Sequence, residues 1–340
     1  MILVTGGTGL LGSHLLFDLT NAGKKVKAIK RTGSQIHNVY KTFRFYTKTP
    51  EKLLDNIEWT TADLLDYQSL EKAFENVKQV YHCAGLVSFE KSKNKLILKN
   101  NIEGTTNIVN ISLEKKIDKF CHVSSIATFG APNEDNLINE QSQWNDNENH
   151  SFYSISKYKA EMEVWRGIAE GLNAVIINPS VILGPGDWKK GTTQLFPLIW
   201  KGNKYCTNGV NGFIDVRDVC EIMINLMNGK IRSERFIVSS ENLSYKQLLS
   251  YIAESLGKKI PNISISKLVF DIVYKYNSLL SKISGKEPVI TNDTARISFQ
   301  KSYYSNQKII DAINVDFIPI KESINQIALK FLKDYLKDNK

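Results

Sequence analysis

Short apolar runs alternate with longer amphipathic segments from the first residue to Ser180. Runs rich in β-branched residues are typical of buried strands, and apolar residues that recur every three or four positions are typical of helices. The runs that predict strands are residues 1–6, 25–31, 57–64, 79–85, 119–125 and 173–180. The segments that predict helices are residues 10–23, 69–77, 99–116 and 153–171. This alternation, with strands apolar on both faces, is typical of a doubly wound parallel sheet.

The pattern changes after Ser180. Residues 181–205 are rich in glycine and aromatic residues, residues 213–229 predict one more strand and helix, and the remainder is mostly helical with short strands. We therefore expect an α/β protein with a Rossmann-type domain and a smaller, mostly helical C-terminal cap for the substrate. The expected division is interleaved, with residues 1–178 and 213–230 in the Rossmann domain and residues 179–212 and 231–340 in the cap. The stretch between the second and third strands is expected to be irregular.

Composition places the chain among soluble globular proteins. Of its 340 residues, 42% are hydrophobic and 23% are charged, and no apolar run approaches the roughly 18 residues of a membrane span. The sequence enters its first strand at once, which leaves no room for a signal peptide, so we expect a cytoplasmic protein without a membrane partner. The four cysteines form no C-x-x-C pair and the five histidines have no metal-ligand spacing, so we expect reduced cysteines and no metal.

The net charge of +9 raises the question of nucleic-acid binding. The lysines are spread singly along the chain and do not gather into a basic stripe interleaved with aromatic residues. We expect a solvated basic surface and no nucleic-acid partner. A positive field of this kind also favours anionic cofactors and substrates.

A glycine-rich stretch, "TGGTGLLG" at residues 5–12, lies between the first predicted strand and the first predicted helix. Gly6 permits a tight turn, Gly9 lets backbone N–H groups approach a diphosphate, and Gly12 lets the helix pack close to the sheet. This context predicts dinucleotide binding. The cofactor contacts expected in this stretch are Gly6, Thr8, Gly9, Leu10, Leu11 and Gly12.

The end of the second predicted strand indicates which dinucleotide binds. A carboxylate there accepts a hydrogen bond from the adenosine ribose, whereas a cation pairs with a 2′-phosphate. The sequence has Lys30 and Arg31 and no carboxylate nearby. We therefore expect NADP(H) as the preferred cofactor, with NAD(H) as the alternative if both cations only face solvent.

Tyr153 and Lys157 stand four positions apart on one face of a predicted helix. Solvated helix pairs often have the same spacing, so the pair alone decides nothing. The strand before this helix ends in Ser124 and Ser125, at the edge where parallel sheets bind ligands. With its glycine stretch, its serine and its Y-x-x-x-K pair, the chain resembles the extended short-chain dehydrogenase/reductase family. Four further stretches match that family in the same order: "HCAG" (82–85), "NIEGT" (101–105), "NPSVILGPG" (178–186) and "FIDVRDV" (213–219).

The resemblance implies a role for each residue of a catalytic set. Tyr153 would be the general acid or base, with a pKa lowered toward working pH by the charge of Lys157. Ser125 would hydrogen-bond the reacting carbonyl oxygen, with Ser124 as the alternative. Asn101 would support a water relay to the lysine, although its position also suits a helix N-terminal cap. The family also implies a homodimer through the helix of Tyr153 and the helix before it.

The resemblance extends the expected cofactor site beyond the glycine stretch. Asp63 and Leu64 are expected at the adenine, although Asp63 also suits the start of a helix. Pro179 and Ser180 are expected to flank the nicotinamide. Tyr153 and Lys157 are also expected to contact the cofactor. The residues expected along the diphosphate and ribose are Cys83, Ala84 and Gly85.

The chain lacks two sequence features that are typical of other branches of the family. Nucleotide-sugar dehydratases carry Thr-Asp-Glu after the first serine, whereas this chain has Ser-Ile-Ala at residues 125–127. Epimerases usually carry an arginine before the "FIDV" strand, whereas this chain has Asn211 and Gly212. The cations that could replace that arginine are Lys189, Lys190 and Arg217. The remaining branch is the reductase branch, and the chain is similar to the dihydroflavonol-4-reductases. This similarity includes the segment "GKEPVIT" at residues 285–291.

We therefore expect an NADP(H)-dependent oxidoreductase that interconverts a carbonyl and an alcohol on a small, apolar substrate. Two alternatives stay open: a nucleotide-sugar epimerase with tightly bound NAD, and a nicotinamide-sensing binding protein without catalysis. The aromatic residues expected either to line the substrate pocket or to form the core of the cap are Trp188, Phe196, Trp200, Tyr205 and Phe213.

Overall fold

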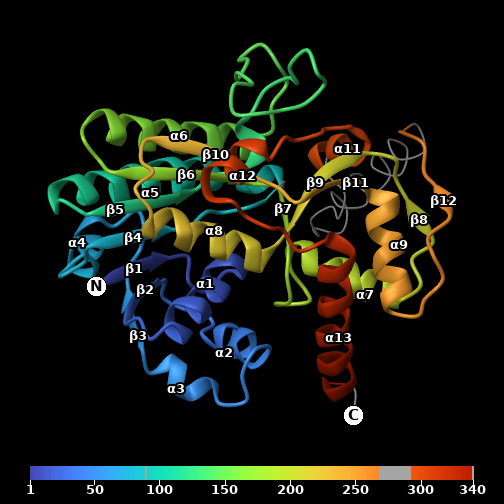
Figure 1. Cartoon of the computed structure of the whole chain (residues 1–340), viewed down its shortest axis with the longest axis horizontal. Helices are drawn as coiled ribbons and strands as arrows, with labels where there is room; N and C mark the ends of the chain where they lie inside the picture. The colour runs from blue at the N-terminus through green and yellow to red at the C-terminus, as the bar shows by residue number, and fades with distance from the viewer. Residues whose placement is uncertain (89, 268–291, 339–340) are drawn as a thin grey trace.

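The computed structural model describes residues 1–88, 90–267 and 292–338. Its centre is a seven-stranded parallel sheet in the order β10-β6-β5-β4-β1-β2-β3 (Figure 1). The strands of this sheet are β1 (Ile2–Thr5), β2 (Val26–Lys30), β3 (Ile57–Thr61), β4 (Gln79–His82), β5 (Lys119–Val123), β6 (Ala174–Pro179) and β10 (Glu234–Val238). Helices cover both faces of the sheet, which confirms the predicted Rossmann-type, doubly wound fold.

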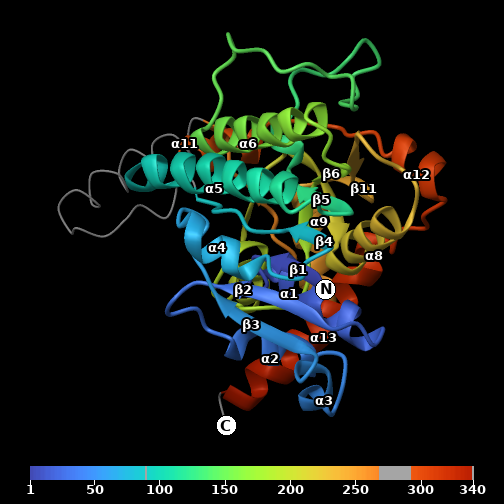
Figure 2. The same ribbon diagram turned by 90° about the vertical axis from the view of Figure 1, so that its left-hand side faces the viewer.

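Alternate residues of the strands enter two different cores, one on each face of the sheet. Leu3 of β1 packs on the side of α4, α5 and α6, whereas its neighbour Val4 packs on the side of α1 and α8. Figure 2 shows α5 and α6 side by side along one face. These helices are α1 (Leu10–Asn21), α4 (Tyr67–Ala73), α5 (Asn94–Glu114), α6 (Phe152–Ala169) and α8 (Val216–Asn228). Because both faces are covered, the central strands are mostly buried and rich in apolar residues, as their sequences predict, whereas the edge strand β3 is partly exposed.

The strand order reverses between β1 and β4. From β1 the chain runs outward to β2 and β3, and from β4 it runs the other way to β5 and β6. Sheets of this kind bind ligands at the carboxyl ends of the strands beside such a reversal. The glycine-rich turn after β1 and the turns after β4, β5 and β6 therefore meet at one edge of the sheet.

The stretch between β2 and β3, expected to be irregular, contains two helices. They are α2 (His37–Arg44) and α3 (Pro50–Leu54). Val39 and Phe43 of α2 are fully buried, and the ring of Phe43 meets that of Phe17 in α1 edge to face at 5.4 Å. Helices this short depend on packing more than on propensity, so the sequence pattern alone did not predict them.

The C-terminal cap has a core of its own, on the right of Figure 1. Its strands form a three-stranded sheet, β11-β9-β7, and a two-stranded sheet, β12-β8. The strands are β7 (Val181–Leu183), β8 (Tyr205–Cys206), β9 (Val210–Asp215), β11 (Glu241–Ser244) and β12 (Ile263–Ser264). The helices of the C-terminal part are α7 (Leu195–Trp200), α9 (Tyr245–Ser255), α11 (Asn292–Phe299), α12 (Gln307–Ile313) and α13 (Ile320–Asp338).

One strand of the main sheet comes from a segment that the predicted division assigns to the cap. β10 lies within residues 231–340, yet it pairs with β6 at the edge of the main sheet. Side chains satisfy this edge, because the Glu140 carboxylate accepts from Ile237 N at 2.7 Å and Lys308 Nζ donates to Arg235 O at 2.9 Å. β9 also belongs to the smaller sheet β11-β9-β7, although the predicted division places residues 213–215 in the Rossmann domain. The rest of the division stays a prediction, and "GKEPVIT" (285–291) lies outside the described residues.

Candidate active site

The turn between β1 and α1 is shaped for a diphosphate. Gly6 has a φ of +69°, and a Cβ on it would lie 2.7 Å from the backbone N of Ala84. A Cβ on Gly12 would lie 2.2 Å from the carbonyl oxygen of Gly6. Gly9 is the N-cap of α1, whose first turn has neither a capping side chain nor a carboxylate. The positive end of the helix dipole is therefore open to an anion, and this cradle fits the diphosphate of a dinucleotide.

The other three predicted residues of this turn lie in different environments. Leu10 sits against the backbone of the "GPG" stretch, since a Cβ on Gly186 would lie 3.0 Å from its Cδ1. Leu11 is buried in the core beneath α1, so only its backbone can face the cradle. Thr8 is half-buried within the turn itself.

A surface cavity of about 480 Å³ lies at the ends of β2 and β3. Its lining residues are Arg31, Thr32, Gly33, Ser34, Thr61, Ala62, Asp63, Asp66 and Ser69. The lining thus includes Arg31 but not the half-buried Lys30. Asp63 accepts from Leu65 N at 2.9 Å, whereas the N-cap of α4 is Asp66. Asp63 thus lies just before this helix without being its N-cap, so its alternative role as an acid at the start of a helix stays a prediction. Leu64 packs on α5, with its Cβ 2.9 Å from where a Cβ on Gly104 would lie.

Lys157 is buried at the carboxyl end of the sheet. It is only 6% exposed, and its Nζ donates to the carbonyl oxygen of Val123, the last residue of β5, at 2.7 Å. A Cβ on Gly85, just past β4, would lie 3.6 Å from the same Nζ. Burial lowers the pKa of Lys157 to about 8, against the opposing attraction of Glu161. The alternative of a solvated pair on the helix surface does not hold for this lysine.

Tyr153 lies one helical turn before Lys157 in α6, and Ser125, which follows β5, lies beside it. Ser125 caps the short turn Ile126–Thr128, where its Oγ accepts from Ala127 N at 3.1 Å. A hydrogen bond joins the hydroxyls of Ser125 and Tyr153. Burial nevertheless raises the pKa of Tyr153, and the bond to Ser125 opposes this rise only in part. The expectation that Lys157 lowers this pKa below its usual value is therefore wrong for the protein alone.

Asn101 lies inside α5, so its alternative role as a helix N-cap is wrong. Its Oδ1 accepts from Leu86 N at 2.7 Å, and its Nδ2 donates to Leu86 O at 3.0 Å and to Ser156 Oγ at 2.9 Å. A Cβ on Gly85 would lie 3.8 Å from its Oδ1. Asn101 thus fastens the turn after β4 to α5 and α6, close to Lys157. Its part in a water relay stays a prediction.

The remaining predicted residues follow β4 and β6. Cys83 and Ala84 are half-buried, and Ala84 N donates to Thr5 Oγ1 at 3.1 Å, which ties the end of β4 to that of β1. Pro179 ends β6, and Ser180 N donates to Val238 O at 2.9 Å. The Ser180 hydroxyl is buried without a hydrogen-bond partner among the described residues. The structure thus brings the predicted residues after β1, β4, β5 and β6 to one edge.

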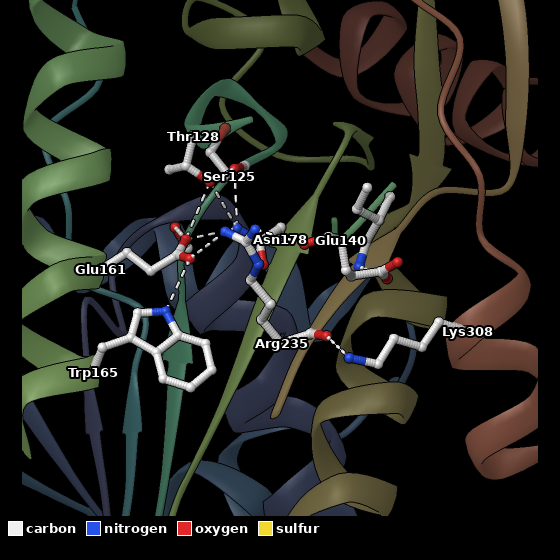
Figure 3. Close-up of polar contacts among 10 residues, drawn as sticks. Ser125, Thr128, Glu140, Glu161, Trp165, Asn178, Arg235 and Lys308 are labelled. Atoms are coloured by element: carbon white, nitrogen blue, oxygen red, sulfur yellow. Dashed lines mark hydrogen bonds and ion pairs between the residues drawn. The ribbon is translucent and has the colours of Figure 1, made fainter. Parts of the chain in front are cut away.

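Two buried side chains at this edge have no role in the sequence-based interpretation. His82 joins Thr5 Oγ1 at 2.7 Å and Thr105 Oγ1 at 3.0 Å, and burial lowers its pKa to about 3, so it stays neutral. Glu161 lies one helical turn beyond Lys157, under the turn that carries Ser125 (Figure 3). In the sequence, His82 could have been identified by its place in the "HCAG" stretch. Glu161 could have been identified as an acidic residue on the apolar face of a predicted helix.

The cations and aromatic residues expected near the substrate are mostly engaged elsewhere. Arg217 forms a two-point ion pair with Asp215 at 2.7 and 2.9 Å, and Lys190 pairs with Asp187 at 3.3 Å. The aromatic residues that belong to the core of the cap are Trp188, Phe196, Trp200 and Phe213. Tyr205 is 54% exposed. Trp188, Phe196, Trp200 and Phe213 thus form the core of the cap, which was the alternative to lining the substrate pocket.

The comparison with known families agrees with this geometry. The sequence model of the NAD dependent epimerase/dehydratase family matches residues 2–238. The chain belongs to this family. It is therefore an NAD(P)-dependent enzyme of the extended short-chain dehydrogenase/reductase type. None of the helices in the described ranges is both long and apolar enough to cross a membrane.

The relatives include several reductases. A Synechocystis sp. protein named after dihydroflavonol 4-reductase is 26% identical over 94% of this chain and 91% of its own. Tetraketide alpha-pyrone reductase 2 of Arabidopsis thaliana is 30% identical over 87% of this chain and 90% of its own. The chain is thus similar to the dihydroflavonol-4-reductase branch, as its motifs predict.

Solved structures share the fold over nearly the whole chain. The crystal structure of gox2253 has a TM-score of 0.81 and 25% identity, with 98% of each chain covered. The UDP-glucose 4-epimerase of Thermotoga maritima has a TM-score of 0.75 at 18% identity, with 98% of this chain and 99% of its own covered. At that identity the likeness to the epimerase concerns the fold alone.

Proposed function

We propose that the protein is an NADP(H)-dependent oxidoreductase that interconverts a carbonyl and an alcohol on a small, apolar substrate. The observation that carries the proposal is the group formed by Ser125, Tyr153 and Lys157 at the carboxyl end of the sheet. The diphosphate cradle after β1 lies at the same edge. Relatives with reductase names support the direction of the chemistry.

In the proposed mechanism the bound nicotinamide supplies or accepts the hydride, and the protein handles the proton. The hydroxyl of Ser125 donates a hydrogen bond to the substrate carbonyl oxygen, and that of Tyr153 delivers the proton. Because burial raises the pKa of Tyr153, this residue is protonated at neutral pH and suits the role of an acid in reduction. Lys157, held in place by the Val123 carbonyl, stabilises the phenolate that is left after the transfer.

The preference for NADP(H) is part of the same proposal. Arg31 lines the cavity at the ends of β2 and β3, together with the hydroxyls of Thr32 and Ser34. A guanidinium with two neighbouring hydroxyls suits a 2′-phosphate. Asp63 and Asp66 line the same cavity, and their carboxylates suit hydrogen bonds to the adenine and ribose.

The residues of β9 and the start of α8 favour an apolar substrate over a nucleotide diphosphate. Asn211 and Gly212 stand where an epimerase arginine is expected, and Asn211 Oδ1 accepts from Gly212 N. Arg217 is already paired with Asp215. These contacts weigh against the nucleotide-sugar epimerase. The sensor alternative is weakened by Lys157, because burying an ammonium group is costly where no chemistry uses it.

The test of the proposed function uses the purified protein. Its bound small molecules are identified by mass spectrometry, and NADPH consumption is followed with a panel of apolar aldehydes and ketones. Turnover of NADPH with a carbonyl compound is the expected result. Tightly bound NAD without consumption of NADPH would favour the epimerase. Binding of NADPH with no turnover of any kind would favour the sensor.

We further propose a cytoplasmic homodimer that pairs through α5 and α6. These two helices lie side by side on one face of the sheet (Figure 2). Each carries an exposed apolar side chain in its first turn, Leu96 in α5 at 50% exposure and Phe152 in α6 at 45%. Exposed apolar residues on neighbouring helices suit a subunit interface.

A further inference from the structure

A buried carboxylate lies beneath the candidate catalytic turn. Glu161 is fully buried in α6, one helical turn after Lys157. Figure 3 shows its side chain pointing from α6 toward the sheet. Its Oε2 accepts from Ser124 Oγ at 2.5 Å, Asn178 Nδ2 at 2.7 Å and Thr128 Oγ1 at 3.1 Å. Its Oε1 accepts from Arg235 Nη1 at 3.1 Å and Trp165 Nε1 at 3.4 Å.

Stability alone does not explain this arrangement. Burying a charge is costly, and a buried ion pair is often no more stable than apolar side chains of the same volume. The charge of Glu161 is balanced by Arg235 of β10, a strand at the edge of the main sheet. Arg235 is itself held by Glu140 O and by the face of the Phe129 ring at 4.4 Å. A buried carboxylate with this many hydrogen-bond partners holds the segments that carry those partners in one geometry.

One of these segments is the turn that carries Ser125. Ser124, before Ser125, donates to Glu161. The single hydroxyl proton of Thr128 is shared between Glu161 Oε2 at 3.1 Å and Ser125 O at 2.9 Å. Asn178 Nδ2 lies 3.2 Å from the same Ser125 oxygen. These contacts fix the backbone of Ser125, while its hydroxyl is hydrogen-bonded to that of Tyr153.

We propose that Glu161 is a positioning residue, whose carboxylate, neutralised by Arg235, holds the Ser124–Thr128 turn so that the Ser125 hydroxyl stays against Tyr153. This inference rests on the proposed function, in which that hydroxyl binds the carbonyl oxygen. Glu161 also supports the charged form of Lys157, since its negative charge raises the pKa that burial lowers.

The test compares Glu161→Gln with Glu163→Gln. Glu163 lies on the same helix but pairs with Arg166 at 3.0 Å and does not contact the turn. We expect Glu161→Gln to lower kcat by about 10- to 100-fold, because a small misplacement of a catalytic group costs that much. The Kd of NADPH should stay within about twofold, since the diphosphate cradle is untouched. Glu163→Gln should leave kcat unchanged, and an unchanged kcat in a folded Glu161→Gln protein would overturn the inference.

A second readout needs no turnover. With 13C at the tyrosine Cζ, the Tyr153 resonance is assigned by its loss in Tyr153→Phe. We expect Glu161→Gln to move it in the same direction as Ser125→Ala, and Glu163→Gln to leave it in place. A resonance unmoved by Glu161→Gln would contradict the positioning role even if no substrate is found. Wild-type protein that turns over no carbonyl compound would instead overturn the proposed function.

A milder variant covers the case in which Glu161→Gln does not fold. Ser124→Ala removes the shortest link between Glu161 and the turn and leaves the ion pair with Arg235 in place. We expect a smaller loss of kcat, about three- to tenfold, and a smaller movement of the Tyr153 resonance. If both stay at their wild-type values, the carboxylate does not act through this turn.

Discussion

At the scale of single residues, the candidate chemistry depends on the hydroxyl of Tyr153. Tyr153→Phe should lower turnover by about 10² to 10⁴-fold, because the proton donor is lost. The Kd of NADPH should stay within about twofold, as measured by fluorescence titration. Tyr158→Phe is the matched control, since Tyr158 lies on the same helix and stacks on Trp144 at 4.4 Å, away from Ser125. Substantial turnover by Tyr153→Phe would remove this residue from the mechanism.

The buried charge of Lys157 lowers the stability of the fold in the proposed function. Its folded-state pKa of about 8 lies below the usual 10.5, so the unfolded chain binds more protons between these values. The burial of its charge therefore costs stability in full below pH 8, and this cost disappears as the pH rises toward 10.5. Lys157→Met should abolish turnover and raise the free energy of unfolding at pH 7 by up to about 3 kcal/mol, at 1.36 kcal/mol for each pKa unit.

Urea unfolding at pH 7 and pH 10 measures this effect. The gain in Lys157→Met should be large at pH 7 and small at pH 10, since wild-type Lys157 is mostly neutral at the higher pH. In the same way, wild-type reduction should slow as the pH rises through about 8, because the neutral amine no longer stabilises the phenolate. An equal gain at both pH values would mean that the charge of Lys157 is not the cause.

Arg31 determines the choice of cofactor in the proposed function. Arg31→Ala should weaken NADPH binding by about 10- to 100-fold, because a charge-assisted contact with the 2′-phosphate is lost. NADH binding should change by less than about threefold. Lys30→Ala is the control, since Lys30 does not line the cavity that contains Arg31. Titrations with both cofactors decide the question, and equal losses for NADPH and NADH would refute the assignment.

At the scale of elements, the sequence predicts what local patterns determine and misses what depends on distant partners. The strands and helices of the sheet follow from apolar runs whose two faces are both buried, as Leu3 and Val4 illustrate. The helix α2 was missed because it depends on packing against α1 and on contacts with α3. Glu161 was missed because its main cation, Arg235, lies 74 positions away and no spacing rule joins them.

The turn between β1 and α1 offers a matched pair of glycine substitutions. Gly6 and Gly23 have similar φ angles, +69° and +74°, but a Cβ at Gly23 meets no atom within 4 Å, whereas one at Gly6 meets the backbone of Ala84. Gly23→Ala should cost about 1 kcal/mol of stability, from the positive φ alone, and leave NADPH binding unchanged. Gly6→Ala should cost more and also weaken NADPH binding at least tenfold. Thermal unfolding and cofactor titration measure both, and similar results for the two variants would mean that the approach of Ala84 is unimportant.

At the scale of the whole molecule, the candidate active site forms only when segments from the entire chain meet. β10 closes the main sheet from a segment more than 50 residues beyond β6, and its Arg235 balances the carboxylate under the candidate catalytic turn. The same site gathers the turns after β1, β4 and β5. The sequence motifs predict the residues of the turns, but not Glu161 and Arg235 beneath them, and the contacts between the parts are a property of the folded chain.

The proposed homodimer belongs to this scale as well. α5 and α6 follow consecutive parallel strands, so their first turns, with Leu96 and Phe152, lie toward the same end of the sheet. Burial of these side chains against a second copy would remove apolar surface from water, worth about 25 cal/mol for each Å². The double variant Leu96→Glu and Phe152→Glu should therefore convert the dimer into a monomer in light scattering after gel filtration. Leu329→Glu is the control, because Leu329 is 68% exposed on α13. A wild-type monomer, or a dimer that survives the double variant, would exclude this interface.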